Sequence, residues 1–298
     1  MRLSPTLLSV LVVTLSASSC SKKNDKKEES SLPTAEATAK SDKTEAPKKD
    51  AEKTEIKGQV DKGDFTFKYG MTENKDLDAY FKENKLLEDM ATDLNALIAM
   101  PKDILIEFGD CGEPNAYYDP EIGHIKICYE LMEAFLEDYD NAFKEDPEED
   151  LAFNAMIGAT MFTIFHELGH ALVDVLKLPV TGKEEDSVDN LASVVMIASG
   201  EEGQQMALDG ATAFMLEAEK TNLRDLAYWD EHSLSAQRFY NVICMVYGSN
   251  PEKYAYLVDD GDLPEERAER CPEEYKRISD SWDTLLEPHF LGFGQGAR

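Results

Sequence analysis

The sequence predicts an α+β fold that is mostly helical, with a small sheet beside one long apolar helix. Two observations lead to this prediction. After about residue 60, most of the chain carries apolar residues at helical spacing, whereas only short segments between 104 and 129 alternate as strands do. The run over 150–177 is also apolar on nearly every face, which is typical of a helix buried in a core. These patterns favour helices packed on a small sheet.

The first expected element is a helix over 75–100, followed by a strand over 104–108. Segments 116–118 and 122–129 are expected to form a hairpin-like pair around a turn that contains proline and glycine. The remaining elements are expected to be helical, over about 130–141, 150–177, 185–199, 204–220 and 233–247, before a looser helical tail.

The amino terminus predicts export. Residues 1–20 contain Arg2, then an apolar stretch, then small residues that end at Cys20, which is the pattern of a signal peptide. Ala17-Ser18-Ser19-Cys20 approximates a bacterial lipobox, so Cys20 is expected to carry lipid and to anchor the protein. The alternative is an ordinary cleaved signal with an incidental cysteine. Either way, the expected location is the bacterial cell envelope: lipid-anchored at the outer membrane or in the periplasm, or at the cell surface.

Residues 21–57 are expected to be a disordered linker, because they are rich in Ser, Lys, Glu, Ala, Thr and Pro and lack aromatic residues. Residues 58–298 are long enough for one domain with a sizeable core. The net charge is −30, and the linker, with ten Lys and nine acidic residues, contributes almost nothing to it. The acidic domain would repel nucleic acid and anionic lipid, so the N-terminal lipid is the one membrane contact expected. The sequence gives no oligomeric state.

Four further cysteines agree with export. An even number in an oxidising compartment predicts two disulfides. The sequence-local pairing joins Cys111 to Cys128 and Cys244 to Cys271, and it is one of three possible pairings. The alternative is four buried thiols. Because no C-x-x-C spacing is present, a thiolate metal site is not expected.

The long apolar helix contains His166-Glu167-Leu168-Gly169-His170, an H-E-x-x-H motif. Positions i and i+4 share a helix face, so both imidazoles can bind one metal ion. Glu167 then lies where it can take a proton from a water at the metal. The pattern predicts zinc-dependent peptide hydrolysis, with Zn²⁺ as the cofactor and a peptide or protein as the substrate.

A third ligand is expected at the start of the next helix, because a catalytic zinc takes three protein ligands and keeps one open position. Glu185 and Asp189 are four residues apart and share a face. Glu185 is the expected ligand, and Asp189 is expected to accept a hydrogen bond from the far nitrogen of a ligating histidine. Glu184, Asp186 and Asp189 remain competing ligands, and a solvated acidic first turn is the alternative for the whole group.

H-E-L-G-H followed by E-x-x-x-D resembles the gluzincin side of the zincin metallopeptidases. More closely, the chain resembles a bacterial metallopeptidase family known as domain of unknown function 4344. The likeness covers most of the chain after about residue 60 and implies a zincin-like fold with a zinc site. A weaker likeness is to intracellular H-E-x-G-H proteases that cleave repressors. The segments that resemble the family of domain of unknown function 4344 are 111–120, 165–172, 184–191, 230–234 and 237–241.

Two further places are expected to carry function. In the zincins that the chain resembles, an edge strand beside the metal pairs with extended substrate, and Asn115, Ala116 and Tyr117 are the candidates here. The alternative is a strand packed in the core. His232, with an acid to orient it, is expected to stabilise the oxyanion. Arg238 is an alternative for that role, or a buried ion-pair partner.

The sequence therefore favours a membrane-anchored, exported zinc metallopeptidase. Two alternatives remain. One is a hydrolase of peptidoglycan peptides or an exopeptidase, which uses the same chemistry in a different cleft. The other is a non-catalytic lipoprotein of zincin fold that acts as a binding module.

Overall fold

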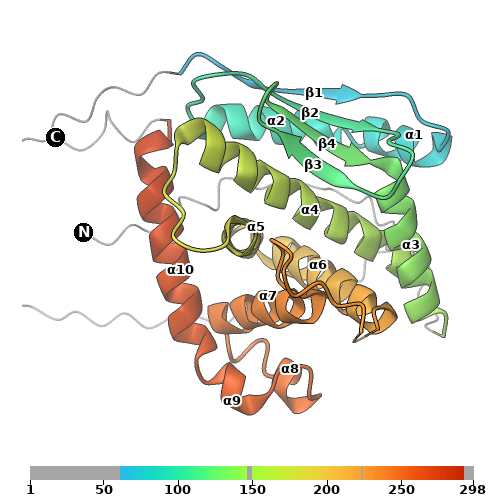
Figure 1. The fold of residues 1–298 in the computed structure, drawn as a ribbon, viewed down its shortest axis with the longest axis vertical. Helices are drawn as coiled ribbons and strands as arrows, with labels where there is room; N and C mark the ends of the chain where they lie inside the picture. Colours follow the sequence, from blue (N-terminus) through green and yellow to red (C-terminus); the bar gives the residue numbers. More distant parts are fainter. Residues whose placement is uncertain (1–60, 146–149, 223, 292–298) are drawn as a thin grey trace, which may run out of the picture. The chain divides into compact units, whose positions relative to one another are not determined.

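The computed structural model describes residues 61–145, 150–222 and 224–291. Within them, a four-stranded sheet is combined with a larger number of helices, so the prediction of a mostly helical α+β fold is confirmed (Figure 1). The signal peptide predicted over 1–20, with Cys20, and the linker predicted over 21–57 lie outside the described residues.

The sheet has the strand order β1-β2-β4-β3. β1, β2 and β4 run parallel, and β3 pairs antiparallel with β4 and forms one edge. The hairpin-like pair is therefore confirmed, whereas β1 was not predicted, although Phe65, Phe67 and Tyr69 alternate as in a strand. The strands are β1 (Phe65–Tyr69), β2 (Ile104–Gly109), β3 (Ala116–Asp119) and β4 (His124–Cys128).

The prediction of one continuous helix over 75–100 is wrong. Two helices, α1 (Lys75–Glu83) and α2 (Leu86–Leu97), replace it. Lys85 between them adopts a left-handed conformation with φ of 53°, which breaks the hydrogen-bond ladder and turns the chain. The turn lets Leu86 and Leu87 bury completely, so burial overrides a continuous helical pattern.

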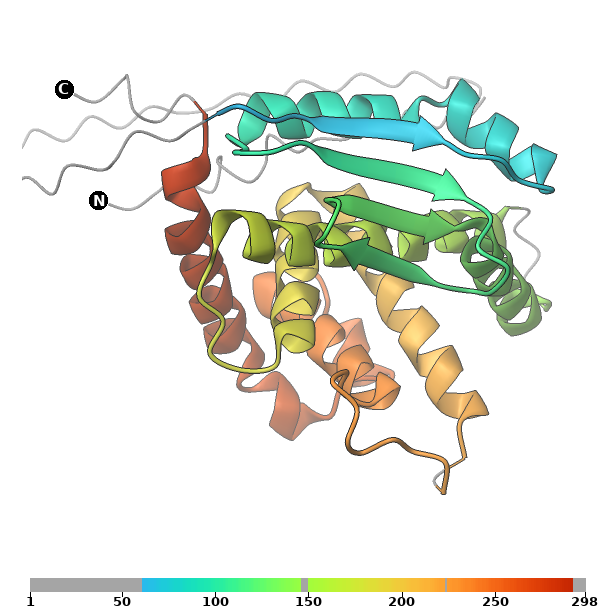
Figure 2. The same cartoon turned by 45° about the horizontal axis from the view of Figure 1, so that its top comes forward.

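The long apolar helix α4 crosses beneath the sheet and contacts β3, β4 and the helices on its other side (Figure 2). By length and composition α4 could span a membrane, but 72% of its most apolar window is buried inside the domain, as expected of a core helix. The helices after α2 are α3 (Tyr129–Phe143), α4 (Leu151–Leu176), α5 (Glu184–Ala198), α6 (Glu201–Lys220), α7 (Ser235–Ser249), α8 (Tyr256–Asp259), α9 (Glu265–Ala268), α10 (Cys271–Leu286) and the 3-10 turn η2 (Glu287–His289).

Both predicted disulfides are present. Cys111 and Cys128, with an S–S distance of 2.03 Å, connect the loop after β2 to the end of β4. Cys244 and Cys271, at 2.01 Å, connect α7 to the start of α10. The first bond therefore holds the chain just before the edge strand, and the second holds the carboxyl-terminal helix on the core.

Asp209 of α6 lies half-buried against α4 where the two helices approach closely at Gly158. Burial raises the pKa of the Asp209 carboxyl to about 7, and the hydrogen bond from Gln205 only partly opposes this shift. Between the unfolded pKa and pH 7, the folded state therefore binds more protons than the unfolded state, and stability falls as pH rises.

We therefore expect Asp209→Asn to stabilise the protein relative to wild type by roughly 2–4 kcal/mol at pH 8, because the neutral amide removes the cost of burying a charge. The gain should be close to zero at pH 4 and should grow until about pH 7. Urea unfolding at both pH values measures it, with exposed Asp140 changed to Asn as the control. A gain that is equal at pH 4 and pH 8 would contradict the assignment.

Candidate metal centre

The motif histidines lie in the middle of α4 and face the same side, as predicted. His166 is buried and His170 half-buried, and their rings meet edge to face with centroids 4.9 Å apart. Their Nε2 atoms are 3.3 Å apart. Two imidazole nitrogens at this distance point toward a common position, which is the arrangement that helical i, i+4 spacing allows.

The first turn of α5 brings Glu185 to this position. Its Oε2 atom lies 3.2 Å from Nε2 of His166 and 3.4 Å from Nε2 of His170. The three ligand atoms lie within 4.8 Å of one another and form a group that could hold a metal ion.

The other acids of this turn lie elsewhere. Glu184 contacts Nδ1 of His170 at 2.8 Å, and Asp189 contacts Nδ1 of His166 at 2.7 Å. Both carboxylates therefore face the ring nitrogens that point away from the common position. Asp186 has no contact with either histidine among the described residues. The geometry favours Glu185 as the third ligand over all three competitors.

The donor atoms of this group fit a cation. A carboxylate at Nδ1 of each histidine favours a proton on Nδ1, which leaves a lone pair on Nε2. The Oε2 atom of Glu185 is buried, and although three imidazole Nε2 atoms lie within 3.4 Å, none meets it in hydrogen-bond geometry. Lone pairs directed at a buried carboxylate oxygen repel one another unless a positive charge lies between them. Two imidazoles and one carboxylate match the ligand set of a catalytic zinc.

The pKa shifts of the two histidines and Glu185 also indicate a site for a cation. Burial acts to lower the pKa of His170, but Glu185 and Glu184 outweigh it and raise the pKa to about 9. Burial also opposes the charge of His166, and Asp189 with Glu185 raises that pKa. For Glu185, burial acts upward but the facing imidazoles hold the pKa well below its ordinary value. The site thus attracts positive charge.

Asp189 is held from its other side by Arg238 of α7. Arg238 donates from Nε to Oδ2 and from Nη2 to Oδ1 of Asp189, both at 2.7 Å. Its guanidinium also lies 3.9 Å from the ring centroid of Phe214. The chain Arg238–Asp189–His166 fixes the orientation of one proposed ligand, so Arg238 has the ion-pair role that was one of its two predicted alternatives.

Glu167 lies next to the ligand His166 in the sequence and lines a cavity. It is buried, and burial raises the pKa of its carboxyl above the ordinary value. A carboxylate with a raised pKa is a stronger base than one in water, which suits a group that must accept a proton near neutral pH. Glu167 therefore has both the place and the chemistry of a general base.

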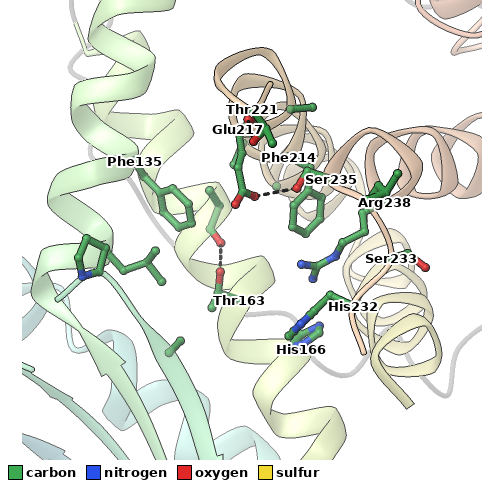
Figure 3. A pocket seen from close by; sticks show the side chains of 18 of the residues that line it. Phe135, Thr163, His166, Phe214, Glu217, Thr221, His232, Ser233, Ser235 and Arg238 are labelled. Carbon is green, nitrogen blue, oxygen red and sulfur yellow. Dashed lines mark hydrogen bonds between the residues drawn. The ribbon is translucent and has the colours of Figure 1, made fainter. Parts of the chain in front are cut away.

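The cavity has a volume of about 830 Å³ and opens beside the motif, with His166 and His232 at one end (Figure 3). His232 lies on the loop between α6 and α7. Its Nδ1 atom is 3.0 Å from Oδ1 of Asp230, and its Nε2 atom is 3.0 Å from Oε2 of Glu185. Contact with Glu185 raises the pKa of His232. The predicted acid that orients His232 is thus Asp230.

The edge strand β3 reaches the same cavity. Asn115 and Ala116 line it, whereas Tyr117 does not. Cys128 donates its backbone N–H to the carbonyl of Asn115, so the main-chain groups of Asn115 and Tyr117 face β4 and those of Ala116 face the open edge. Tyr118 on the next position donates its hydroxyl to Asp174 of α4, so the Tyr117 side chain points to the opposite face of the sheet.

Gly169, inside the motif, permits the close approach of α5. A Cβ atom at this position would lie 2.7 Å from Cβ and 2.8 Å from Cγ1 of Val188, which is buried and branched. We expect Gly169→Ala to destabilise the metal-free protein by about 1–2 kcal/mol, because overpacking outweighs the helix preference of alanine. It should also weaken metal binding, since α5 carries Glu185.

Urea unfolding with chelator present measures the change in stability. Gly182→Ala is the matched control, because nothing lies within 4 Å of the added atom there. Equal stability of the Gly169 and Gly182 variants would contradict the close-packing argument.

Several cavity residues were not predicted from the sequence. They come from α3, α6 and the loop that follows α6, which no motif connects to α4. Phe135, Phe214 and Glu217 are examples. A single sequence does not mark them as cavity residues, because an aromatic residue on a helix is usually a core residue and an acidic residue on a helix is usually a solvated one.

The fold and site together define a candidate metal-dependent hydrolase with a two-histidine, one-glutamate centre. Comparison with known families agrees. Residues 68–286 match the family DUF4344, described as "Putative metallopeptidase", and the chain belongs to this family. Membership supports a peptidase that depends on a metal. No curated protein and no solved structure matches the chain, so the zincin-like part of the fold prediction stays a prediction.

Proposed function

We propose that this protein is an exported zinc metallopeptidase with Glu167 as its general base. One observation carries the proposal. The Nε2 atoms of His166 and His170 and the Oε2 atom of Glu185 converge within 4.8 Å beside a buried carboxylate, at one end of a cavity large enough for a peptide segment.

His166, His170 and Glu185 would hold the metal. The chemistry that Zn²⁺ would supply there is that of a Lewis acid, which would lower the pKa of a water toward neutrality and polarise the scissile carbonyl. Glu167 accepts the proton of the attacking water and passes it to the leaving amine, because it lies in the motif between the two histidines and lines the cavity. Asp189, held by Arg238, keeps His166 in the tautomer that leaves Nε2 free.

Two elements position the substrate in this proposal. The open edge of β3 at Ala116 offers main-chain groups to an extended peptide, and the Asn115 side chain, which now accepts from the Ala116 N–H, would turn away. His232, fixed by Asp230, lines the cavity and stabilises the oxyanion that forms on the carbonyl oxygen when water adds to the carbonyl carbon. The proposed site therefore combines residues of α4, α5 and α7 with the edge strand β3 and the loop before α7.

The amino terminus supplies the location. We propose that residues 1–20 direct export, that Cys20 carries the lipid anchor, and that residues 21–57 separate the domain from the bacterial envelope membrane. The two disulfides support this placement, because such bonds persist in oxidising compartments.

The test is hydrolysis of an unfolded protein by the purified, zinc-loaded protein, followed by mass spectrometry of the products. Internal cuts that a chelator abolishes and added zinc restores are the expected result. Trimming from the termini alone would favour an exopeptidase. Zinc bound without any hydrolysis would contradict the proposal and favour the binding module.

A further inference from the structure

We propose that the cavity beside Glu167 binds a lysine or arginine side chain of the substrate, and that Glu217 determines this specificity. The proposal rests on the proposed peptidase function and adds the substrate class. The basic residue is the one that supplies the leaving amine, because Glu167, which protonates that amine, lines the same cavity.

The walls of the cavity are mainly apolar. Phe135 of α3, Phe162 of α4 and Phe214 of α6 line it, with small residues such as Ala159 and Gly210 between them. Phe162 and Phe214 pack edge to face with centroids 5.7 Å apart, which makes a firm wall. A long hydrocarbon stem can therefore lie along the cavity without losing contact with apolar surface.

Negative charge in the cavity exceeds positive charge. Arg238 is the one lysine or arginine that lines it in the described parts of the chain, and both its donating nitrogens bind Asp189. Asp138 at the wall forms an ion pair with Lys220, and Asp230 contacts His232. Asp189, Asp138 and Asp230 are thus each paired with a basic protein group.

Glu217 of α6 forms no ion pair with a lysine or arginine in the described parts of the chain, although its negative charge helps to raise the pKa of Arg238. The one described hydrogen-bond partner of Glu217 is the Ser235 hydroxyl, which donates to Oε2 at 3.0 Å. In Figure 3 the Glu217 carboxylate points into the cavity at the end away from His166, with Phe135 and Phe214 on either side in this view. A carboxylate in a cavity with aromatic walls can receive a cation on a flexible apolar stem, because aromatic rings can contact the stem and also attract the charge.

A lysine or arginine satisfies each of these features. Its methylene groups contact the aromatic walls, and its charge meets Glu217. An acidic side chain would be repelled, and an aliphatic side chain of equal length would not form the ion pair with Glu217, whose exposed carboxylate would stay in contact with water. The acidic surface of the whole domain acts in the same direction, since it attracts cationic peptides at long range.

The test measures binding apart from hydrolysis. Zinc-loaded full-length Glu167→Gln protein is titrated with fluorescent peptides that differ at one position: lysine, norleucine or glutamate. Lysine is expected to bind about fivefold more tightly than norleucine, the order of effect for a partly exposed ion pair, and glutamate more weakly than both. In this background, Glu217→Gln should remove the preference for lysine, and Glu217→Lys should reverse it toward glutamate.

Glu219→Gln is the matched control, because it makes the same change of charge on the same helix, and Glu219 does not line the cavity. A preference for lysine that survives in Glu217→Gln, or a wild-type cavity that prefers norleucine, would overturn the proposal.

Failure of the enzyme proposal gives a different result. If zinc-loaded wild type cuts nothing but the lysine preference depends on Glu217, the specificity stands and the peptidase function falls. If wild type cuts peptides without new amino termini at Lys or Arg, and Glu217→Gln leaves the cut sites unchanged, the specificity falls and the peptidase function stands.

Discussion

Glu167→Gln is expected to lower kcat/KM for peptide hydrolysis by about 10²–10⁴-fold, the contribution typical of a general base. The amide has nearly the shape of the carboxylate, but it cannot accept the proton of the attacking water. The variant should keep its metal, because His166, His170 and Glu185 are unchanged and Glu167 is not among the converging ligand atoms. Kinetics together with metal analysis separates the two effects.

The exposed residue Glu219, changed to Gln, is the control and should leave both quantities unchanged. Full activity in Glu167→Gln would remove Glu167 as the base. Loss of activity in parallel with loss of metal would instead make Glu167 a structural part of the site.

Asp189→Ala is expected to cost about 3–5 kcal/mol of unfolding free energy, because it leaves the guanidinium of Arg238 buried without a counter-charge. Asp189 is buried and the Arg238 side chain is only 14% exposed, and two hydrogen bonds of 2.7 Å join them between α5 and α7. Asp189 also orients His166, so metal affinity should fall by about 10–100-fold. Urea unfolding with chelator measures the first effect without the second.

The double variant with Arg238→Ala tests the physical cause. Removing both charges leaves no unpaired charge from this ion pair, so the double variant should be less destabilised than the sum of the two single variants. Additive losses, or a loss below about 1 kcal/mol in Asp189→Ala, would show that this pair does not behave as a buried ion pair.

The sequence predicted the part of the site that lies on two neighbouring helices. His166, Glu167 and His170 follow from helical spacing, and Glu185 and Asp189 follow from the same spacing on the next helix. Glu184 and Glu185 are adjacent, so which of them faces the Nε2 atoms of the two histidines depends on the rotation of α5 relative to α4. That rotation is set by packing at Gly169 and Val188, which a single sequence does not reveal.

Other features depend on contacts between distant segments. The break at Lys85 arises because α2 must bury its apolar face on the core, and propensity alone favours continuity across it. Strand β1 is short and pairs with β2, which lies far along the chain. Lys68 of β1 and its partner Glu107 of β2, for example, are 39 residues apart in the sequence. Glu217 approaches the cavity through the packing of α6 on α4. Each of these outcomes depends on tertiary structure, and local pattern does not determine it.

Metal content per chain is the most direct test of the central claim, that His166, His170 and Glu185 hold a catalytic zinc. Elemental analysis would compare wild type, His166→Ala, Glu185→Ala and the control Glu184→Ala after incubation with zinc and removal of the excess. We expect about one zinc in wild type and in the control, and almost none in the other two, because a catalytic zinc needs its three protein ligands. No zinc in wild type, or zinc lost with Glu184→Ala and kept with Glu185→Ala, would contradict the account.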